Sequence, residues 1–378
     1  MVFGCTAGLI AVEVAVRLMG VSYPQPYVPD TQLGSRLQPG FEGWFTREGR
    51  AYVTVNSAGF RDREHTKNKP DGTFRIAVLG DSYAEAVQVP IEHTFWSVLE
   101  RELGEAKPRE ARFGKVEVLN FGISGYGTAQ ELETLRHVAL EYDPDLVLVA
   151  FLSGNDIRNN SKLLEPVKVR PFYELMGDEL VLDTSFRQHP DFLKAQSGST
   201  RFKVSCINSS RILQMLADFK NRSADHSDQP EQGLNAEIYS EPTDSAWQAA
   251  WTLTNRLLTT MSEVCETQGV KFAVVTLTNA AQVHPDPGER ERLARQLKSA
   301  DLFYPEKRIA ELGEGHGFIV ITLAQHMAQR ATETKTFYHG FANTRLGSGH
   351  WNASGHQIAG ERMAAELLKS GALENNVP

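Results

Sequence analysis

The chain alternates short, continuously apolar runs with segments of helical periodicity, and this alternation limits the folds open to it. The apolar runs occupy residues 74–80, 115–122, 145–156, 270–277 and 317–323. Such runs are typical of strands that are buried on both faces of a parallel sheet. Between them, residues 84–103, 128–142 and 245–269 place apolar side chains at helical spacing. This order of strands and helices predicts an α/β fold with a doubly wound, mostly parallel sheet flanked by helices.

Charge and motif content argue against several classes of partner. The formal net charge is −8 and the isoelectric point is about 5.8, whereas nucleic-acid affinity comes mainly from Lys and Arg side chains that neutralise phosphates. No Gly-x-Gly-x-x-Gly or phosphate-loop pattern occurs, which argues against a nucleotide cofactor. The scattered Cys5, Cys206 and Cys265 favour lone thiols, with a Cys206–Cys265 bridge as the alternative. We therefore expect no nucleic-acid partner, no metal and no cofactor.

The N-terminal region differs in composition from the rest of the chain. Residues 1–20 are almost wholly apolar and approach the length of about 20 residues that crosses a bilayer, but Glu13 and Arg17 interrupt them. We predict a hydrophobic, anchor-like helix here, with an amphipathic helix docked on the domain as the alternative. Residues 21–70 then form a Pro- and Gly-rich extension, and residues 71–378 form the main domain.

Residues 161–242 interrupt the alternation of strands and helices. Charged, aromatic and polar residues mix there without a sustained period, and residues 221–235 have the composition of a loop. We interpret this stretch as an insertion into the main domain. Because insertions on α/β sheets often cover the ligand crevice, a substrate-shaping lid and a surface decoration both stay open.

Polar residues follow three of the predicted strands, and the carboxyl ends of parallel strands meet at one edge of a sheet. Ser82 lies in "GDSY" after the first strand, Gly125 in "ISGYG" after the second, and Asn155 in "SGND" after the third. A serine at the start of a helix exposes its hydroxyl in the positive field of the helix N-terminus. His350 lies just before Asn352, a good N-cap for the last helix, and would reach the same edge.

These residue types suit nucleophilic attack on an acyl carbonyl. A serine hydroxyl needs a base that takes its proton, and His350 is the candidate for that role. The attack creates an oxyanion, for which the backbone N–H of Gly125 and the side-chain amide of Asn155 are fixed donors. Taken alone, Ser82 is better explained as a residue that caps a helix, and Asp81 is expected to be structural and to bind loop amides.

The blocks "GDSY", "ISGYG", "GND" and "HWNASGH", in this order, resemble those of the SGNH hydrolases, also called the GDSL esterase and lipase superfamily. The resemblance implies Ser82 as the nucleophile and one oxyanion donor, Gly125 as the second donor, Asn155 as the third, and His350 as the base. The block "NSAGFRD" and the hydrophobic start further resemble bacterial members of the family that are anchored in the membrane and face outward.

The chain departs from the family pattern at one position. The family usually carries an aspartate two or three residues before the histidine, where this chain has Ser348 and Gly347. Three explanations stay open: a carbonyl or amide orients His350, an acid from elsewhere in the chain does so, or catalysis is lost. Losing the acid need not abolish turnover, because the oxyanion hole and substrate binding retain part of the catalysis.

The resemblance implies a serine esterase that removes small O-acyl groups, such as acetyl, from a carbohydrate or a related ester through a Ser82 acyl-enzyme. An O-acyltransferase on the same site and a non-catalytic glycan- or partner-binding module are the alternatives. The implied location is the bacterial cell envelope, with the N-terminus in the membrane and the domain facing the periplasm or the exterior. His356 is expected on a helix face rather than on a metal with His350. His339 is expected to be a surface or packing residue, with lining of the pocket as a second option. Trp247 and Trp251 are expected in the core.

Overall fold

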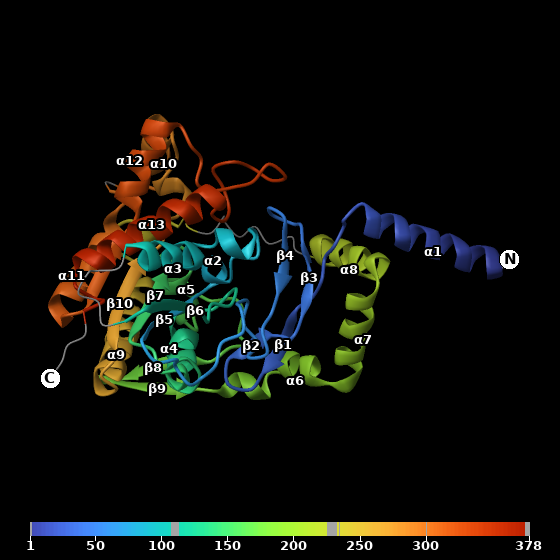
Figure 1. Cartoon of the computed structure of the whole chain (residues 1–378), viewed down its shortest axis with the longest axis horizontal. Coiled ribbons are helices and arrows are strands. Elements are labelled where there is room, and N and C mark those ends of the chain that lie inside the picture. Colours follow the sequence, from blue (N-terminus) through green and yellow to red (C-terminus); the bar gives the residue numbers. More distant parts are fainter. Residues whose placement is uncertain (1, 107–112, 225–232, 234, 300, 375–378) are drawn as a thin grey trace.

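The computed structural model describes residues 2–106, 113–224, 233, 235–299 and 301–374. The apolar runs form one sheet at the centre of the domain (Figure 1). Its strands lie in the order β11 (Ile319–Thr322), β10 (Lys271–Thr276), β7 (Leu146–Phe151), β5 (Thr73–Gly80) and β6 (Lys115–Asn120), and every pairing is parallel. Every residue of β5 and β7 is buried, as expected for strands covered on both faces. The prediction of an α/β fold with a doubly wound sheet is confirmed.

Helices cover both faces of this sheet and bury an apolar core on each side. On one side lie α3 (Phe95–Glu105), α12 (Ala324–Thr334) and α13 (Ala353–Lys369). On the other lie α4 (Thr128–His137), α9 (Ser245–Thr267) and α11 (Tyr304–His316). The shorter α5 (Asp156–Asn160) and α10 (Pro287–Gln296) follow β7 and β10 in the chain. The two cores hold the sheet rigidly, and the loops at its carboxyl edge are therefore firmly supported.

The single helix predicted over residues 84–103 is broken in the structure. A short helix, α2 (Ser82–Glu85), ends at Ala86, whose φ of 53° lies in the left-handed region. Pro90 follows, and its missing N–H and fixed φ prevent a helix from continuing through it. After the 3-10 helix η1 (Ile91–His93), α3 begins where the Thr94 hydroxyl caps the Ser97 N–H. Further 3-10 helices are η2 (Ala139–Tyr142), η3 (Ser185–Gln188), η4 (Ala236–Ile238) and η5 (Ala280–Gln282).

The extension forms two antiparallel hairpins that lie beside the main domain (Figure 1). The first pairs β1 (Tyr27–Asp30) with β2 (Gly34–Leu37), and the second pairs β3 (Glu42–Phe45) with β4 (Ala51–Thr54). Leu37 and Val53 are buried in a small apolar cluster that also includes Val87 of the main domain. The extension is therefore packed against the main domain close to the end of α2. The predicted domain boundaries stay a prediction.

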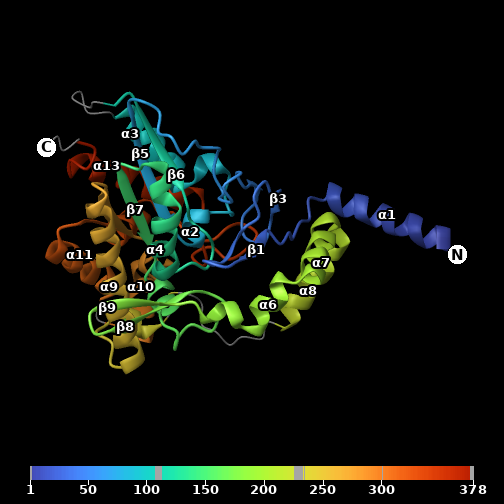
Figure 2. The same ribbon diagram turned by 90° about the horizontal axis from the view of Figure 1, so that it is seen from below.

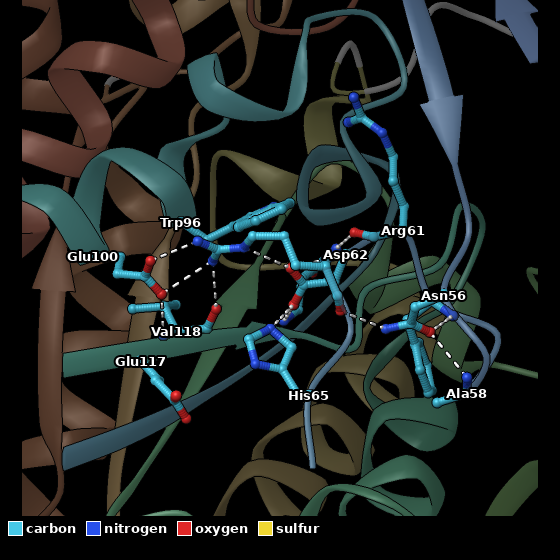
Figure 3. Close-up of polar contacts among 12 residues, drawn as sticks. Asn56, Ala58, Arg61, Asp62, His65, Trp96, Glu100, Glu117 and Val118 are labelled. Carbon is cyan, nitrogen blue, oxygen red and sulfur yellow. Dashed lines mark hydrogen bonds and ion pairs between the residues drawn. The ribbon is translucent and has the colours of Figure 1, made fainter. Parts of the chain in front are cut away.

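The "NSAGFRD" block fastens the extension to the edge strand β6 (Figure 3). The Asn56 side-chain oxygen accepts the N–H groups of Ala58 and Phe60, which closes the turn. The Asp62 carboxylate then accepts the N–H of Asn120 at 2.7 Å, at the end of β6. Arg61 is fully buried and donates to the carbonyls of Glu85, Ala86 and Val89. The block therefore ties the end of β6 to the turn that follows α2.

The first helix, α1 (Val2–Leu18), projects away from the sheet and docks through the two charged residues in its apolar sequence (Figure 1). The Glu13 carboxylate accepts the N–H of Arg211 at 2.9 Å, and Arg17 donates to the carbonyl of Ser209 at 2.8 Å. Burial opposes ionisation of Glu13, but the hydrogen bonds it accepts lower its pKa to about 2. Among the residues that the structure describes, none of the helices has both the length and the apolar character that a membrane crossing requires.

Residues 161–242 contain a hairpin and a helical arm. The hairpin pairs β8 (Phe172–Met176) with β9 (Glu179–Asp183). Figure 2 shows α6 (Pro190–Gln196), α7 (Gly198–Ser209) and α8 (Arg211–Ala224) leading from the domain to α1. Most of the loop predicted over residues 221–235 lies outside the described residues. The interpretations of this stretch as a lid or a decoration both stay predictions.

The two cysteines whose side chains the structure describes are free thiols. Cys206 lies in α7 and is partly buried, whereas Cys265 is buried on the inner face of α9. The interpretation as lone thiols is therefore correct for this pair, and the alternative of a Cys206–Cys265 bridge is wrong. The side chain of Cys5 lies outside what the structure describes.

Candidate active site

The three predicted loops meet at the carboxyl edge of the sheet. Ser82 is the first residue of α2, directly after β5, and Asn155 precedes α5 after β7. Gly125 lies in the loop between β6 and α4. The strand that follows β5 in the sequence, β6, lies on one side of β5, and the next strand, β7, lies on the other side. Ligands of doubly wound sheets bind where the strand order reverses in this way.

A hydrogen bond joins Ser82 and His350. Nε2 of His350 lies 2.9 Å from Oγ of Ser82, although the two residues are 268 positions apart in the sequence. Both residues are partly buried, so neither is sealed off from solvent. The prediction that these two side chains meet at one edge therefore agrees with the geometry.

The other ring nitrogen of His350 contacts an acid that the sequence did not point to. Oε2 of Glu48 lies 2.6 Å from Nδ1 of His350, and Oε1 of Glu48 accepts the backbone N–H of His350 at 2.8 Å. Glu48 lies in the tight loop between β3 and β4, at the tip of the second hairpin of the extension. An acid from elsewhere in the chain, one of the three explanations left open, thus occupies the place beside the histidine.

The ionisation of Glu48 suits this position. Burial opposes ionisation, but the hydrogen bonds from His350 and the electrostatic attraction to its ring outweigh burial and hold the pKa of Glu48 below its usual range. The side chain of Glu48 is 18% exposed and that of His350 is 24% exposed, so solvent screens the pair only in part. Glu48 is therefore a carboxylate at neutral pH and favours a proton on Nδ1 of His350.

The backbone before His350 leaves room for this carboxylate. Gly349 has a φ of 78°, and a Cβ built on it would lie 2.2 Å from Oε1 of Glu48. Gly347, one of the two positions where the family usually has its aspartate, has a φ of 80°. Residues other than glycine adopt such angles only at an energetic cost. The two glycines therefore give the loop a conformation in which the Glu48 carboxylate can lie against its backbone.

A buried polar network holds the backbone of the loop that carries His350. The Gly349 carbonyl accepts hydrogen bonds from the hydroxyl of Tyr83 at 3.1 Å and from Nδ1 of His339 at 2.8 Å. Nε2 of His339 lies 3.0 Å from the Thr278 hydroxyl, which accepts the indole N–H of Trp351 at 2.8 Å. Burial lowers the pKa of His339 to about 4, so its ring is neutral. His339 is thus a packing residue, as one of its two predicted roles required.

Asp81 holds Asn155 beside the nucleophile. The Asn155 amide donates one hydrogen to Oδ2 of Asp81 at 2.6 Å, and Oδ1 of Asp81 accepts the N–H of Tyr83 at 2.9 Å. Asp81 therefore caps the short helix α2, as predicted for a structural residue. An amide nitrogen carries two hydrogens, so Asn155 keeps a second one for another acceptor.

Gly125 forms the turn on the opposite side of α2. It is exposed, has a φ of 80°, and its carbonyl accepts a hydrogen bond from Nη2 of Arg170 at 2.6 Å. The preceding residue, Ser124, donates its N–H to Oε2 of Glu85 at 2.5 Å. The loop therefore has a fixed conformation, in which a glycine suits the positive φ.

The remaining residues singled out by the sequence belong to the packing of the domain. Nδ1 of His356 accepts the Phe95 N–H at 3.2 Å, and the two rings stack. Trp247 and Trp251 are buried in the core on the α9 side of the sheet. Within the described part of the chain, no group of three or more His, Cys, Asp or Glu side chains is placed to hold a metal ion.

Comparisons with known proteins give structural relatives but no sequence relatives. No family model matches the chain, and no curated protein matches it. Among solved structures, the chain resembles a lipase/acylhydrolase from Enterococcus faecalis, with 14% identity over 79% of this chain and 96% of that one and a TM-score of 0.40. It also resembles a GDSL-like lipase from Bacteroides thetaiotaomicron, with 12% identity over 78% of this chain and 88% of that one and a TM-score of 0.34.

A catalytic mutant of an acetylxylan esterase from Geobacillus stearothermophilus is a third structural relative, with 11% identity over 80% of this chain and 94% of that one and a TM-score of 0.39. These relatives are esterases and lipases, the class of enzymes whose sequence blocks this chain resembles. Because identities and TM-scores this low assign no activity to the chain, its chemistry has to be argued from its own side chains.

Proposed function

We propose that this chain is a serine esterase of the SGNH type, in which Ser82 attacks an acyl carbonyl with the help of His350 and Glu48. The observation that supports this most strongly is the hydrogen-bonded line from Glu48 through His350 to Ser82, with contacts of 2.6 Å and 2.9 Å. An acid, an imidazole and a hydroxyl in this order make a serine nucleophilic at neutral pH.

In the acylation step, Nε2 of His350 takes the Ser82 hydroxyl proton while Oγ forms a bond to the acyl carbon. The electron pair of the carbonyl double bond moves onto its oxygen and gives a tetrahedral oxyanion. The oxyanion then collapses, the bond to the leaving oxygen breaks, and His350 gives its proton to the departing alcohol. Glu48 stabilises the imidazolium that exists between these two proton transfers.

In the deacylation step, water takes the place of the alcohol. His350 removes a proton from the water as its oxygen bonds to the acyl carbon, and a second oxyanion forms. When that oxyanion collapses, the bond from the acyl carbon to Oγ breaks and His350 returns the proton to Ser82. The carboxylic acid leaves, and the enzyme is regenerated.

The proposed donors to the oxyanion are the N–H groups of Ser82 and Gly125 and the second amide hydrogen of Asn155. In support, the Asn155 amide is held in place by Asp81, and the Gly125 turn is exposed and fixed in conformation. Donors fixed before the reaction stabilise a developing charge more effectively than donors that must reorganise.

A carboxylic ester is the substrate class that this geometry supports. An O-acetylated saccharide, which the sequence resemblance implies, is the first substrate to test, and the envelope location stays a prediction. The non-catalytic alternative arose because the family's aspartate is absent. The position of Glu48 beside His350 removes that reason, so hydrolysis is the preferred function and acyl transfer stays as a branch of the test.

A labelling experiment and an activity measurement test the proposal together. A fluorophosphonate should label the wild-type protein and Ser199→Ala, an exposed control on α7, but not Ser82→Ala. Hydrolysis of p-nitrophenyl acetate should fall at least about 10³-fold in both Ser82→Ala and His350→Ala. Hydrolysis that persists in both variants would rule out this site. Acetylated saccharide formed when a free saccharide is added would assign acyl transfer.

A further inference from the structure

The carboxyl group of Glu85 is fully buried one helical turn after Ser82, and the proposed reaction does not use it. A buried carboxyl group is costly unless its oxygens are hydrogen-bonded. Here the Tyr27 hydroxyl donates to Oε1 at 2.8 Å, and the Ser124 N–H donates to Oε2 at 2.5 Å. The side chain therefore connects the extension to the loop that carries Gly125.

The position of Glu85 in α2 links it to the nucleophile. Ser82 and Glu85 are separated by three positions on one helical turn, so their side chains leave the same face of the helix. The far end of this turn is held as well, because Arg61 donates to the carbonyl of Glu85 at 2.8 Å. Any movement of the Glu85 carboxyl group relative to Ser82 is therefore small.

The Ser124 N–H is the group through which Glu85 can act on the proposed oxyanion site. Ser124 directly precedes Gly125, whose N–H is a proposed oxyanion donor, and Gly125 is itself exposed. Glu85 holds the Ile123–Ser124 peptide group through its N–H, and Arg170 holds the next-but-one peptide group through the Gly125 carbonyl. The peptide group between them, which carries the Gly125 N–H, is therefore restrained from both sides. A donor that is aimed before the substrate arrives costs no reorganisation during the reaction.

Tyr27 holds Glu85 from the extension. Tyr27 as a whole residue is 38% exposed, yet its hydroxyl lies 2.8 Å and 3.1 Å from the two carboxyl oxygens of the buried Glu85. Tyr27 belongs to β1 of the first hairpin, whereas the acid Glu48 belongs to the loop of the second hairpin. Both hairpins of the extension therefore contact residues next to Ser82, the first through Glu85 and the second through His350.

We infer that Glu85 is a positioning residue for the oxyanion loop, and that Tyr27 keeps Glu85 in place by its hydroxyl hydrogen bond. The inference rests on the proposed esterase function. Glu85 touches neither substrate nor the reacting atoms, and it acts through Ser124 on the direction of the Gly125 N–H. Loss of the Tyr27 hydroxyl therefore weakens oxyanion stabilisation and leaves ground-state substrate binding unchanged.

The test compares two Tyr→Phe variants of the full chain, each of which removes one hydroxyl from the extension. Tyr27→Phe removes the donor to Glu85, whereas Tyr52→Phe removes an exposed hydroxyl that donates to Glu42 at 3.0 Å. The readouts are kcat and KM for p-nitrophenyl acetate and the inhibition constant of phenylboronic acid. A boronic acid forms a tetrahedral adduct on a catalytic serine and so reports on the oxyanion donors.

In Tyr27→Phe, we expect kcat to fall and phenylboronic acid to bind more weakly by the same factor, about 3- to 10-fold, with KM within about twofold of wild type. Complete loss of one oxyanion donor lowers kcat about 10²–10³-fold, so a donor that stays present but is less well oriented lowers kcat by a smaller factor. Tyr52→Phe should match wild type. If both variants bind phenylboronic acid equally well, the inference is wrong.

Glu85 itself provides a second pair of variants. Glu85→Gln keeps a side-chain oxygen that can accept the Ser124 N–H, so it should retain most of the activity. Glu85→Ala should lose more activity than Tyr27→Phe, with melting temperatures measured to separate unfolding from misalignment. An active Ser82→Ala would overturn the proposed function itself. An inactive Ser82→Ala combined with wild-type kinetics in Tyr27→Phe and Glu85→Ala would overturn only this inference.

Discussion

His350 has a hydrogen-bonding partner on each of its ring nitrogens, and the two partners fix its tautomer. Nδ1 faces the carboxylate of Glu48, so that nitrogen carries the proton and Nε2 is free to accept the proton of Ser82. The backbone N–H of His350 binds the same carboxylate and prevents the ring from turning away. A single glutamate thus sets both the protonation and the orientation of the proposed base.

The first prediction at the residue scale concerns Glu48. In Glu48→Gln, the amide can present either its oxygen or its NH₂ group to Nδ1, and the charge that stabilises the imidazolium is lost. We expect kcat for p-nitrophenyl acetate to fall by about 10²–10⁴-fold with little change in KM, by analogy with the acid of serine proteases.

The matched control for Glu48 is Glu42→Gln on the same hairpin. Glu42 is exposed and accepts a hydrogen bond from Tyr52, and within the described part of the chain no hydrogen bond joins it to His350. Its replacement should leave kcat unchanged. Equal activities in the two variants would show that His350 needs no carboxylate beside it.

Short stretches of the sequence were enough to predict the strands and to propose four site residues, Ser82, Gly125, Asn155 and His350. A buried strand needs only a run of apolar residues, and Ser82, Gly125 and Asn155 each follow such a run directly. Glu48 was missed because nothing near it distinguishes it from other surface acids. Its role depends on a contact with a residue 302 positions away, which local patterns do not encode.

At the scale of secondary-structure elements, the loop between β3 and β4 is the part that must be held in place. The Asn343 side chain accepts the N–H of Gly49 at 2.9 Å and donates to the carbonyls of Thr46 and Gly49 at 3.1 Å and 3.0 Å. Asn343 lies in the same loop as His350. The two segments that meet in the Glu48–His350 contact are therefore also joined by a second, independent set of hydrogen bonds.

This arrangement predicts the effect of Asn343→Ala. With the hydrogen bonds of Asn343 removed, the hairpin loop can shift and Glu48 is no longer aligned with His350. We expect kcat to fall about tenfold, because small misplacements of catalytic groups are costly, while the melting temperature changes by only a few degrees. The measurement is steady-state hydrolysis combined with thermal unfolding.

A double variant separates alignment from a general effect of Asn343. If Asn343 acts through Glu48, then adding Asn343→Ala to Glu48→Gln should lower kcat far less than it does in the wild type. A tenfold further loss in the double variant would mean that Asn343 acts by another route.

At the scale of the whole molecule, the site joins parts of the chain that lie far apart in the sequence. The sheet supplies Ser82 and Asn155, the C-terminal region supplies His350, and the extension supplies Glu48. The packing of these parts includes two buried histidines, His339 behind the site and His356 in α13. Stability of the fold is therefore linked to pH through groups that take no part in the reaction.

The sign of this pH dependence follows from the shifted pKa values. Burial lowers the pKa of His339 to about 4 and that of His356 to about 3, compared with a usual value of 6.5. Between these values, the unfolded chain binds protons that the folded chain does not bind. The stability that these two histidines contribute is therefore fully present above about pH 6.5 and is lost as the pH falls toward 4. Each histidine contributes a slope of up to about 1.4 kcal/mol per pH unit.

Urea unfolding between pH 4.5 and 7.5 tests this link with His356→Gln and a surface control. Glutamine keeps an oxygen that can accept the Phe95 N–H, but it does not titrate. The free energy of unfolding should therefore fall less steeply on acidification than in the wild type, by roughly the slope that one histidine contributes. In His137→Gln, which replaces a half-exposed side chain on α4, the slope should match the wild type. Parallel pH profiles for wild type and His356→Gln would mean that His356 gains its proton without unfolding, and that the domain is more open to acid than its packing indicates.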